Sequence, residues 1–263
     1  MMLKIVLVQL EIEDGNKERN LINALDILNR ISSTTELPDI VCFPELFTTG
    51  YDLKNVKQYA EVFPGKTIEK ILNISTGKFS VIGTILERED DNYYNTAFIL
   101  DKLGIMVGKY RKVHLFSPML EKEFLSPGNT IDVFELPSLS KLKVGIAVCY
   151  DLRFPEVFRK LALQGAEIIF VPSEFPNPKE EVWRTLLRAR AIENQLYIVA
   201  INRIGQGMAN DFFGASLVTN GRYIEDMGEF RGSRIFSIDL DDLKPIRTAI
   251  PLLQDRKPDV YDL

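Results

Sequence analysis

Cys149 is the side chain of this sequence best placed to act as a nucleophile. It directly follows the apolar run 144–148, and Pro155 with Glu156 marks the start of a helix six residues later. The cysteine is therefore predicted to lie on a turn between a strand and a helix. In open α/β sheets, ligands bind at the carboxyl ends of strands, where backbone N–H groups can face a developing oxyanion. Most free cysteines are buried apolar residues, and position by itself leaves that alternative open.

Glu45 is a candidate general base. It follows the apolar segment 40–43, and Pro44 ends that strand and directs the next side chain off its end. Desolvation by aromatic neighbours such as Phe47 and Tyr51 would raise the pKa of Glu45 into the range useful for a base acting on a thiol. The alternative is a loop carboxylate that faces water, because acidic residues are rarely fully buried.

Lys112 ends a basic stretch, 109–112, of the kind that usually forms a solvated strand edge. The period of two of a strand puts Lys112 and Tyr110 on one face, so this lysine can point inward. A buried lysine needs a carboxylate partner, and Glu121 and Glu123 follow within a dozen residues. Such a lysine would supply fixed positive charge to an oxyanion, whereas surface ion pairing is the alternative.

His114 is the only histidine, and it offers a second way to activate the thiol, through a Cys–His pair. A lone histidine after a strand more often donates to a backbone carbonyl. One histidine excludes a two-histidine metal site, and Cys42 and Cys149 are neither a C-x-x-C pair nor at zinc-ligand spacing. No metal, cofactor or disulfide framework is expected.

The apolar patterns predict the elements that must position these residues. Two blocks have β-α-β order, which implies parallel pairing, and between them 81–87 and 93–100 flank the polar segment 88–92 as an antiparallel hairpin. The blocks are strand 3–10, helix 17–32 and strand 40–43, then strand 142–148, helix 155–164, strand 168–171, helix 179–194 and strand 197–202. Further short strands are expected at 106–110, 131–136, 215–219 and 234–238. The chain is therefore α/β with mixed sheets.

One compact layered domain over residues 1–263 is predicted. The strands are too many for one small sheet, no linker or repeat divides the chain, and 46% hydrophobic residues suffice for a sizeable core. Residues 241–263 contain Pro245, Pro251 and Pro258 without a sustained period. This last stretch is predicted to be an extended tail suited to docking on a partner subunit.

The net charge of the chain argues against two classes of partner. A net charge of −5 and a pI near 5.2 provide no basic surface, so neither nucleic acid nor an anionic membrane is an expected partner. The apolar run 5–8 is far shorter than a signal-peptide core or the ~20 residues of a membrane span. A cytoplasmic protein is expected.

Taken together, the contexts of Glu45, Lys112 and Cys149 resemble those of the nitrilase superfamily, the carbon–nitrogen hydrolases that use a Glu-Lys-Cys triad. The resembling segments occur in the same order and cover nearly the whole chain. They are 43–51 (FPELFTTGY), 110–116 (YRKVHLF), 126–128 (SPG), 149–156 (CYDLRFPE), 188–195 (RARAIENQ), 202–205 (NRIG) and 214–216 (GAS).

The resemblance implies a four-layer α-β-β-α sandwich, in which helices cover the outer faces of two mixed sheets. It also implies a homodimer that forms through helices near the nucleophile, with the C-terminal segment crossing to the partner. A second glutamate of the family lies upstream of the Ser-Pro-Gly turn, and the matching position is Glu121, six residues before Pro127, rather than Glu123.

The resemblance further implies an amidase acting on a small-molecule terminal amide. The segments 149–156 and 188–195 are similar to the branch with omega-amidases and deaminated-glutathione amidases, and 47–51 with 112–116 favours omega-amidases, which hydrolyse 2-oxo acid amides. An N-carbamoyl amide hydrolase of the same superfamily, a Cys149–His114 hydrolase and a non-catalytic nitrilase-like binding subunit are the alternatives.

In the expected mechanism, Glu45 takes the thiol proton as Cys149 attacks the amide carbonyl. Lys112 and the Tyr150 backbone N–H stabilise the oxyanion, and Glu121 holds Lys112 charged and oriented. Ammonia leaves, and water then hydrolyses the thioester.

Substrate selection is assigned to aromatic side chains and one arginine. Tyr51, Phe116 and Phe175 are expected to line the pocket, and Arg153 could anchor a carboxylate of the substrate. Arg153 could equally be a structural partner of Asp151 or of a second acidic residue, Glu156.

Overall fold

The computed structural model describes residues 1–261. Its first sheet contains the first strand of the chain, β1, whose side chains alternate between two cores. The strand order is β15-β1-β2-β4-β5-β6, with β3 paired to β4. Pairing is parallel along β1-β2-β4 and antiparallel for β15-β1, β4-β5 and β5-β6, so the sheet is mixed. The strands are β1 (Met2–Gln9), β2 (Ile40–Cys42), β3 (Glu61–Val62), β4 (Ser80–Glu89), β5 (Asn92–Asp101), β6 (Ile105–Arg111) and β15 (Gly232–Asp239).

The second sheet has three parallel strands at its centre. Its order is β14-β13-β10-β9-β8-β7, with β8, β9 and β10 parallel and the outer pairs antiparallel. The strands are β7 (Phe134–Leu136), β8 (Leu142–Ile146), β9 (Ile168–Ser173), β10 (Tyr197–Asn202), β13 (Leu217–Thr219) and β14 (Ile224–Asp226). A separate two-stranded ribbon joins β11 (Ile204–Gln206) and β12 (Asp211–Phe213).

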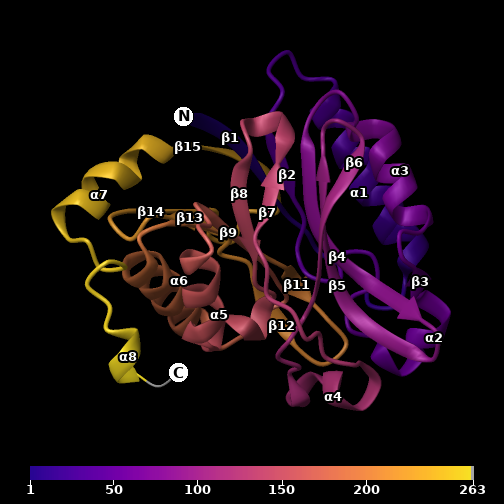
Figure 1. The fold of residues 1–263 in the computed structure, drawn as a ribbon. Coiled ribbons are helices and arrows are strands. Elements are labelled where there is room, and N and C mark those ends of the chain that lie inside the picture. Colours follow the sequence, from indigo (N-terminus) through magenta and orange to yellow (C-terminus); the bar gives the residue numbers. More distant parts are fainter. Residues whose placement is uncertain (262–263) are drawn as a thin grey trace.

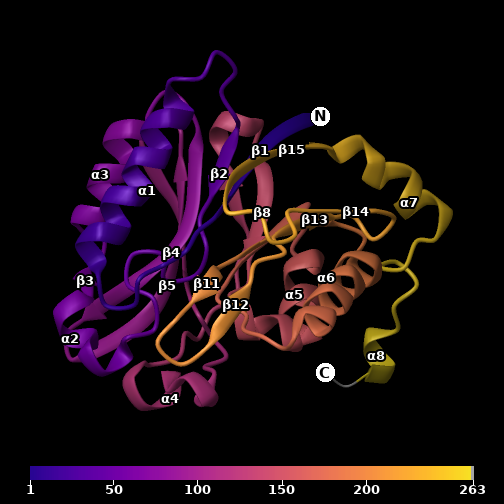
Figure 2. The ribbon, with the colours of Figure 1, turned by 180° about the vertical axis from the view of Figure 1, so that it is seen from behind.

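Helices cover the outer face of each sheet (Figures 1 and 2). The first sheet carries α1 (Lys17–Ser32) and α3 (Lys66–Ser75), and the second carries α5 (Pro155–Leu163) and α6 (Glu180–Asn194). Ile5 and Leu7 of β1 share a core with the second sheet, whereas Val6 and Val8 pack under α1 and α3. This period of two is the reason that one strand serves two cores. The expected four-layer sandwich is confirmed.

The hairpin between β4 and β5 has a tighter turn than the sequence indicated. The ladder continues to the pair Glu89–Asn92, so the turn consists of Asp90 and Asp91 instead of the five residues 88–92. Asp90 has φ +53°, a conformation that aspartate tolerates better than most residues. The strands therefore keep pairing to the last residue before the turn.

The expected tail contains two short helices, α7 (Leu243–Ala249) and α8 (Pro258–Tyr261), in its described part. Pro245 lies in the first turn of α7 and Pro258 begins α8, positions at which the missing proline N–H costs no helical hydrogen bond. Gln195 at the end of α6 donates from Nε2 to the carbonyl of Ile250, 2.6 Å away. This contact ties the segment to the second helical layer.

Two further helices are short: α2 (Val56–Tyr59) and α4 (Glu121–Phe124). No helix among residues 1–261 combines the length and the apolar character that crossing a membrane requires.

Candidate active site

The four residues expected to carry the chemistry lie at neighbouring ends of different elements. Glu45 follows β2, Lys112 follows β6, Glu121 begins α4, and Cys149 begins a 3-10 turn after β8. All four are buried, with exposed fractions of 0% for both glutamates, 1% for the lysine and 5% for the cysteine. The first sheet thus brings the acid and the lysine to the cysteine of the second.

Lys112 is held between two carboxylates. Its Nζ lies 2.8 Å from Glu45 Oε1 and 2.8 Å from Glu121 Oε2. Burial opposes the charge of the lysine, but the charges of Glu121 and Glu45 outweigh it and raise the pKa of Lys112 above its ordinary value. The side chain is therefore a fixed cation inside the site.

Both carboxylate oxygens of Glu45 accept hydrogen bonds. Oε1 accepts from Asn95 Nδ2 at 2.7 Å as well as from Lys112, and Oε2 accepts from the backbone N–H of Glu174 at 2.8 Å. The adjacent Leu46 N–H donates to the Thr84 hydroxyl at 2.7 Å, which fixes the turn after β2. These bonds fix the orientation of a fully buried carboxylate.

Glu121 is tied to the rest of the site by three donors besides Asn95. The Phe116 N–H lies 2.6 Å from Oε2, the Tyr51 hydroxyl lies 3.0 Å from Oε1, and Lys112 bonds to both oxygens. Burial raises the pKa of Glu121, although Lys112 opposes the shift. Glu123, the other glutamate weighed from the sequence, is exposed.

Cys149 has a strained backbone and a protonated thiol. Its φ is +44°, which is rare for a residue with a side chain, and the turn around it is fixed by Asp151, which accepts the Val148 N–H at 2.8 Å. Burial raises the pKa of the thiol well above its ordinary value, and the Glu45 carboxylate adds to that rise. A buried, neutral thiol needs a base before it can attack, and Glu45 is the adjacent one.

His114 makes its contacts with Asp151 rather than with the cysteine. Its Nδ1 lies 2.8 Å from Asp151 Oδ1, and its ring stacks on Phe154 at 3.6 Å between centroids. The Tyr110 hydroxyl donates to the other oxygen of Asp151 at 2.7 Å. This geometry supports a structural histidine and gives no support to a Cys–His pair.

Two of the residues expected to line the pocket, Phe116 and Phe175, contact side chains of the turn that begins at Cys149. The rings of Phe116 and Tyr150 lie 4.8 Å apart, and the guanidinium of Arg153 lies over the Phe175 ring at 5.6 Å. Arg153 and Glu156 are both exposed, and Asp151 pairs with His114 instead of with Arg153. The structural alternative for this arginine is therefore not supported.

Sequence reasoning missed three residues of the site: Asn95, Glu174 and Arg203. Asn95 is a polar residue on β5 whose Nδ2 lies within hydrogen-bonding distance of Glu45 and of Glu121. The signal available in the sequence was an amide side chain two residues before the apolar run 97–100 of that strand. Glu174 follows β9, which is next to the strand β8 that leads to the cysteine, and Arg203 follows β10, which is next to β9. The carboxyl ends of these parallel strands lie at one edge of the sheet, which was the available signal.

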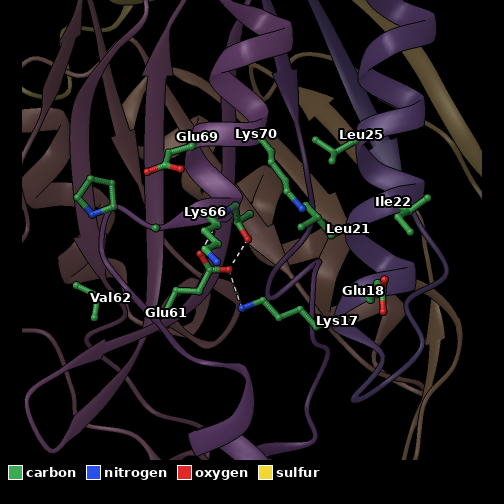
Figure 3. A pocket seen from close by; sticks show the side chains of 13 residues that line it. Lys17, Glu18, Leu21, Ile22, Leu25, Glu61, Val62, Lys66, Glu69 and Lys70 are labelled. Atoms are coloured by element: carbon green, nitrogen blue, oxygen red, sulfur yellow. Dashed lines mark hydrogen bonds and ion pairs between the residues drawn. The ribbon is translucent and has the colours of Figure 1, made fainter.

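One cavity borders the candidate site, and a second lies apart from it. A cavity of about 230 Å³ borders the site through Tyr51 and Arg203. A larger one of about 740 Å³ lies at α1 and α3, where Lys17 pairs with Glu61 at 2.6 Å (Figure 3). No residue that the sequence marked for chemistry lines the larger cavity, and its central carboxylate is already paired. Among residues 1–261, no group of three or more His, Cys, Asp or Glu side chains is arranged to hold a metal ion.

The four-layer fold and the buried Glu, Lys and Cys define a hydrolase of carbon–nitrogen bonds. The sequence model of the carbon-nitrogen hydrolase family matches residues 4–248, so the chain belongs to that family and the resemblance to the nitrilase superfamily is confirmed. A 2-oxoglutaramate amidase from Bacillus subtilis (strain 168) is 36% identical over 259 residues, which cover 97% of each chain. Omega-amidase NIT3 from Saccharomyces cerevisiae is 32% identical, over 98% of this chain and 94% of its own.

A solved structure agrees with these relatives. The crystal structure of Saccharomyces cerevisiae Nit3, a member of branch 10 of the nitrilase superfamily, matches with a TM-score of 0.88 and 29% identity and covers 97% of each chain.

Proposed function

We propose that this protein is a thiol-dependent amidase that hydrolyses the terminal amide of a small 2-oxo acid amide. The observation that carries the proposal is the buried lysine held at 2.8 Å by each of two glutamates beside a protonated, strained cysteine. The relatives named 2-oxoglutaramate amidase and omega-amidase support the substrate class.

The first half of the reaction acylates the cysteine. Glu45 accepts the thiol proton while Cys149 Sγ attacks the amide carbonyl carbon, and Lys112 with the Tyr150 backbone N–H stabilises the oxyanion. As the tetrahedral intermediate collapses, Glu45 returns the proton to the nitrogen and ammonia leaves. A thioester to Cys149 remains.

The second half releases the acid. Glu45 takes a proton from water, the hydroxide attacks the thioester carbonyl, and the same donors stabilise the second oxyanion. The carbon–sulfur bond then breaks, the carboxylic acid departs, and the thiolate recovers its proton from Glu45. These steps require only side chains of this protein and water.

Glu121 acts on the reaction through Lys112. Its carboxylate keeps the ammonium charged and fixes its direction, and the Tyr51 hydroxyl and Phe116 N–H hold that carboxylate in turn. Preorganised charge of this kind costs no rearrangement when the oxyanion forms.

Arg153 is assigned to the carboxylate of the substrate. It is exposed near the nucleophile, its guanidinium lies over the Phe175 ring, and arginine binds carboxylates through two parallel hydrogen bonds. Tyr51 and Phe116 complete the pocket walls in this proposal.

We further propose a cytoplasmic homodimer. Two free cysteines, both buried, suit a reducing compartment. Leu163 of α5 and Ile192 of α6 each have about half of their surface accessible, and a cavity of about 780 Å³ runs along α5 and is also lined by Tyr261. A second copy of the chain would cover this apolar face.

The test is ammonia release from 2-oxoglutaramate, 2-oxosuccinamate, deaminated glutathione, a carbamoyl amino acid and a simple nitrile. Release from a 2-oxo amide that disappears in Cys149→Ala is the expected result. Arg153→Met should raise the KM for that substrate ~10-fold or more and leave turnover of a neutral amide unchanged. Ammonia release from the carbamoyl compound alone, or from deaminated glutathione alone, would mean that the substrate is not a 2-oxo acid amide. Full activity of Cys149→Ala would refute the mechanism.

A further inference from the structure

A second buried cluster of charges lies next to Glu45 and has no part in the mechanism above. It consists of Asp14, Glu174 and Arg203. The Nη1 atom of Arg203 lies 2.7 Å from Asp14 Oδ1 and 2.7 Å from Glu174 Oε2. Neither Arg203 nor Glu174 has exposed side-chain surface. Charged groups with this degree of burial are costly unless they are well paired, so the cluster needs an explanation.

The cluster joins the two sheets at the edge where the candidate site lies. Asp14 belongs to the loop after β1 of the first sheet, whereas Glu174 and Arg203 follow β9 and β10 of the second. Arg203 also donates from Nη2 to the carbonyls of Ile12, at 2.5 Å, and of Gln206, at 2.9 Å. One guanidinium thus connects loops from both sheets.

One direct hydrogen bond and one path of two hydrogen bonds through Tyr51 connect this cluster to the glutamates of the candidate site. The Glu174 backbone N–H donates to Glu45 Oε2 at 2.8 Å. Asp14 Oδ1 accepts the backbone N–H of Tyr51 at 3.0 Å, and the Tyr51 hydroxyl donates to Glu121 at 3.0 Å. A displacement of the cluster would therefore move the expected base.

We propose that Asp14, Glu174 and Arg203 form a clamp that positions Glu45, with Glu174 as the positioning residue. The clamp fixes the chain after β9, so that the Glu174 N–H keeps Glu45 Oε2 in place while Lys112 and Asn95 hold Oε1. Small misplacements of a catalytic group cost large factors in rate, which is why such support matters.

The acidic side chains of the clamp, Asp14 and Glu174, outnumber its one basic side chain, Arg203. Glu174 Oε1 is buried without a hydrogen-bond partner, and burial outweighs Arg203 and raises the pKa of Glu174 to about 8. The charged groups that face it are Arg203, Asp14 and Glu45. Below this pKa the Glu174 carboxyl is protonated, and above it the carboxyl is an anion beside Glu45.

Two substitutions separate positioning from charge. Glu174→Gln has the shape of the protonated acid, keeps an oxygen acceptor for Arg203 and cannot ionise. Glu174→Ala removes the acceptor and leaves space beside the arginine, so the backbone that holds Glu45 is free to move. The first variant should preserve function near neutral pH, and the second should not.

The experiment measures the rate at which iodoacetamide alkylates Cys149, by mass spectrometry, from about pH 6 to about pH 10. The proposal rests on Glu45 being the base of the proposed amidase, but alkylation reports on the thiol without any substrate. Near pH 7, Glu174→Ala should slow alkylation ~10-fold because Glu45 no longer lies in place to take the proton. Glu174→Gln should keep the wild-type rate near pH 7 and reach half-maximal alkylation at a lower pH, because no anion forms beside Glu45.

Glu87→Gln is the matched control, since Glu87 is also a buried carboxylate in ion pairs, with Lys109 and Arg111, each at 2.5 Å. It should lower the melting temperature and leave the alkylation profile unchanged. Wild-type profiles in both Glu174 variants, with only stability reduced, would overturn the clamp. If Glu174→Ala does not fold, Glu174→Gln still tests the proposal. An alkylation midpoint at the wild-type pH in that variant would count against the clamp. A shifted profile in a protein that hydrolyses no amide would support the clamp and refute the proposed function.

Discussion

At the scale of the residue, Lys112 shows how a buried charge is kept. Removing water would neutralise an isolated lysine, but two carboxylates at 2.8 Å reverse that tendency and raise its pKa. Burial raises the pKa of the Cys149 thiol well above its ordinary value, and the charge of Glu45 adds to that rise, so the thiol stays protonated. Without substrate, the proton is therefore on the sulfur of Cys149 and the positive charge is on the nitrogen of Lys112.

Glu121→Gln tests whether the negative charge of Glu121 is needed to hold Lys112 in place. The amide keeps the shape and an acceptor for the Phe116 N–H but removes one of the two negative charges next to Lys112. We expect kcat to fall ~100-fold, because the lysine would be held less well in the direction of the oxyanion, with a smaller effect on KM. Steady-state kinetics on the substrate identified by the ammonia assay measure both values.

The neighbouring Glu123→Gln is the control, since its side chain is exposed and it should leave kcat unchanged. Equal kinetics in the two variants would mean that Glu121 has no role in turnover.

At the scale of the element, the turn at Gly128 supports the end of β6. The Gly128 N–H donates to the carbonyl of Lys112 at 2.9 Å, and a Cβ on Gly128 would lie 2.1 Å from the carbonyl oxygen of Arg111. That contact is with backbone, so the strand end that carries Lys112 would have to shift. Only glycine allows this approach.

Gly128→Ala should therefore reduce both activity and stability. We expect a loss of ~1–3 kcal/mol in the free energy of unfolding and a fall of ~100-fold in kcat, because a shift of the strand end displaces the lysine. Urea denaturation and kinetics on the same preparation measure the two effects.

Gly77→Ala provides the comparison, because nothing lies within 4 Å of a Cβ there although φ is +78°. It should cost stability through backbone strain and leave kcat at the wild-type value. Wild-type kcat in Gly128→Ala would show that the Ser-Pro-Gly turn does not position the lysine.

At the scale of the whole molecule, Glu174 should make stability depend on pH. Its pKa is raised from 4.5 to about 8 in the folded protein, so between these values the unfolded state binds fewer protons than the folded state. The contribution of Glu174 to the free energy of unfolding is therefore present at low pH and is lost as pH rises through this range. The loss is at most about 1.4 kcal/mol per pH unit.

The difference in the free energy of unfolding between the wild type and Glu174→Gln isolates this contribution, since other ionisable groups are common to both. Urea unfolding at several pH values between roughly 5 and 9 should show the wild type losing stability relative to the variant as pH rises. Parallel curves would mean that Glu174 is ionised throughout.

The outer helical layer makes a prediction about assembly. Leu163 and Ile192 on α5 and α6 are 49% and 50% exposed, and substituting both by glutamate would put charge into the proposed dimer contact. Light scattering should then report the mass of one chain instead of two. Ile22→Glu on α1, where the side chain is 51% exposed, should leave the dimer intact. A monomeric wild type would refute the proposed homodimer.

Much of the fold followed from local patterns. The predicted helix 17–32 coincides with α1, and the run 142–148 contains β8, because burial of one helix face or of a whole parallel strand leaves a clear apolar period. The ends of short strands were predicted less well. The predicted strand 131–136 is observed only as β7, Phe134–Leu136, because pairing with the neighbouring strand, and not composition, decides where a strand ends.

The sequence by itself determined the family, the layered α/β class and the three residue types of the candidate site, since each stands in a distinctive local context around Glu45, Lys112 and Cys149. Only the tertiary structure decided that Lys112 bonds to Glu45 and Glu121 together, that His114 bonds to Asp151, and that the Glu174 N–H donates to Glu45 across 129 positions of sequence. Local patterns record whether a residue is apolar and where a strand ends. The partner of a buried charge depends on which loops the two sheets bring together, and that is a property of the folded chain.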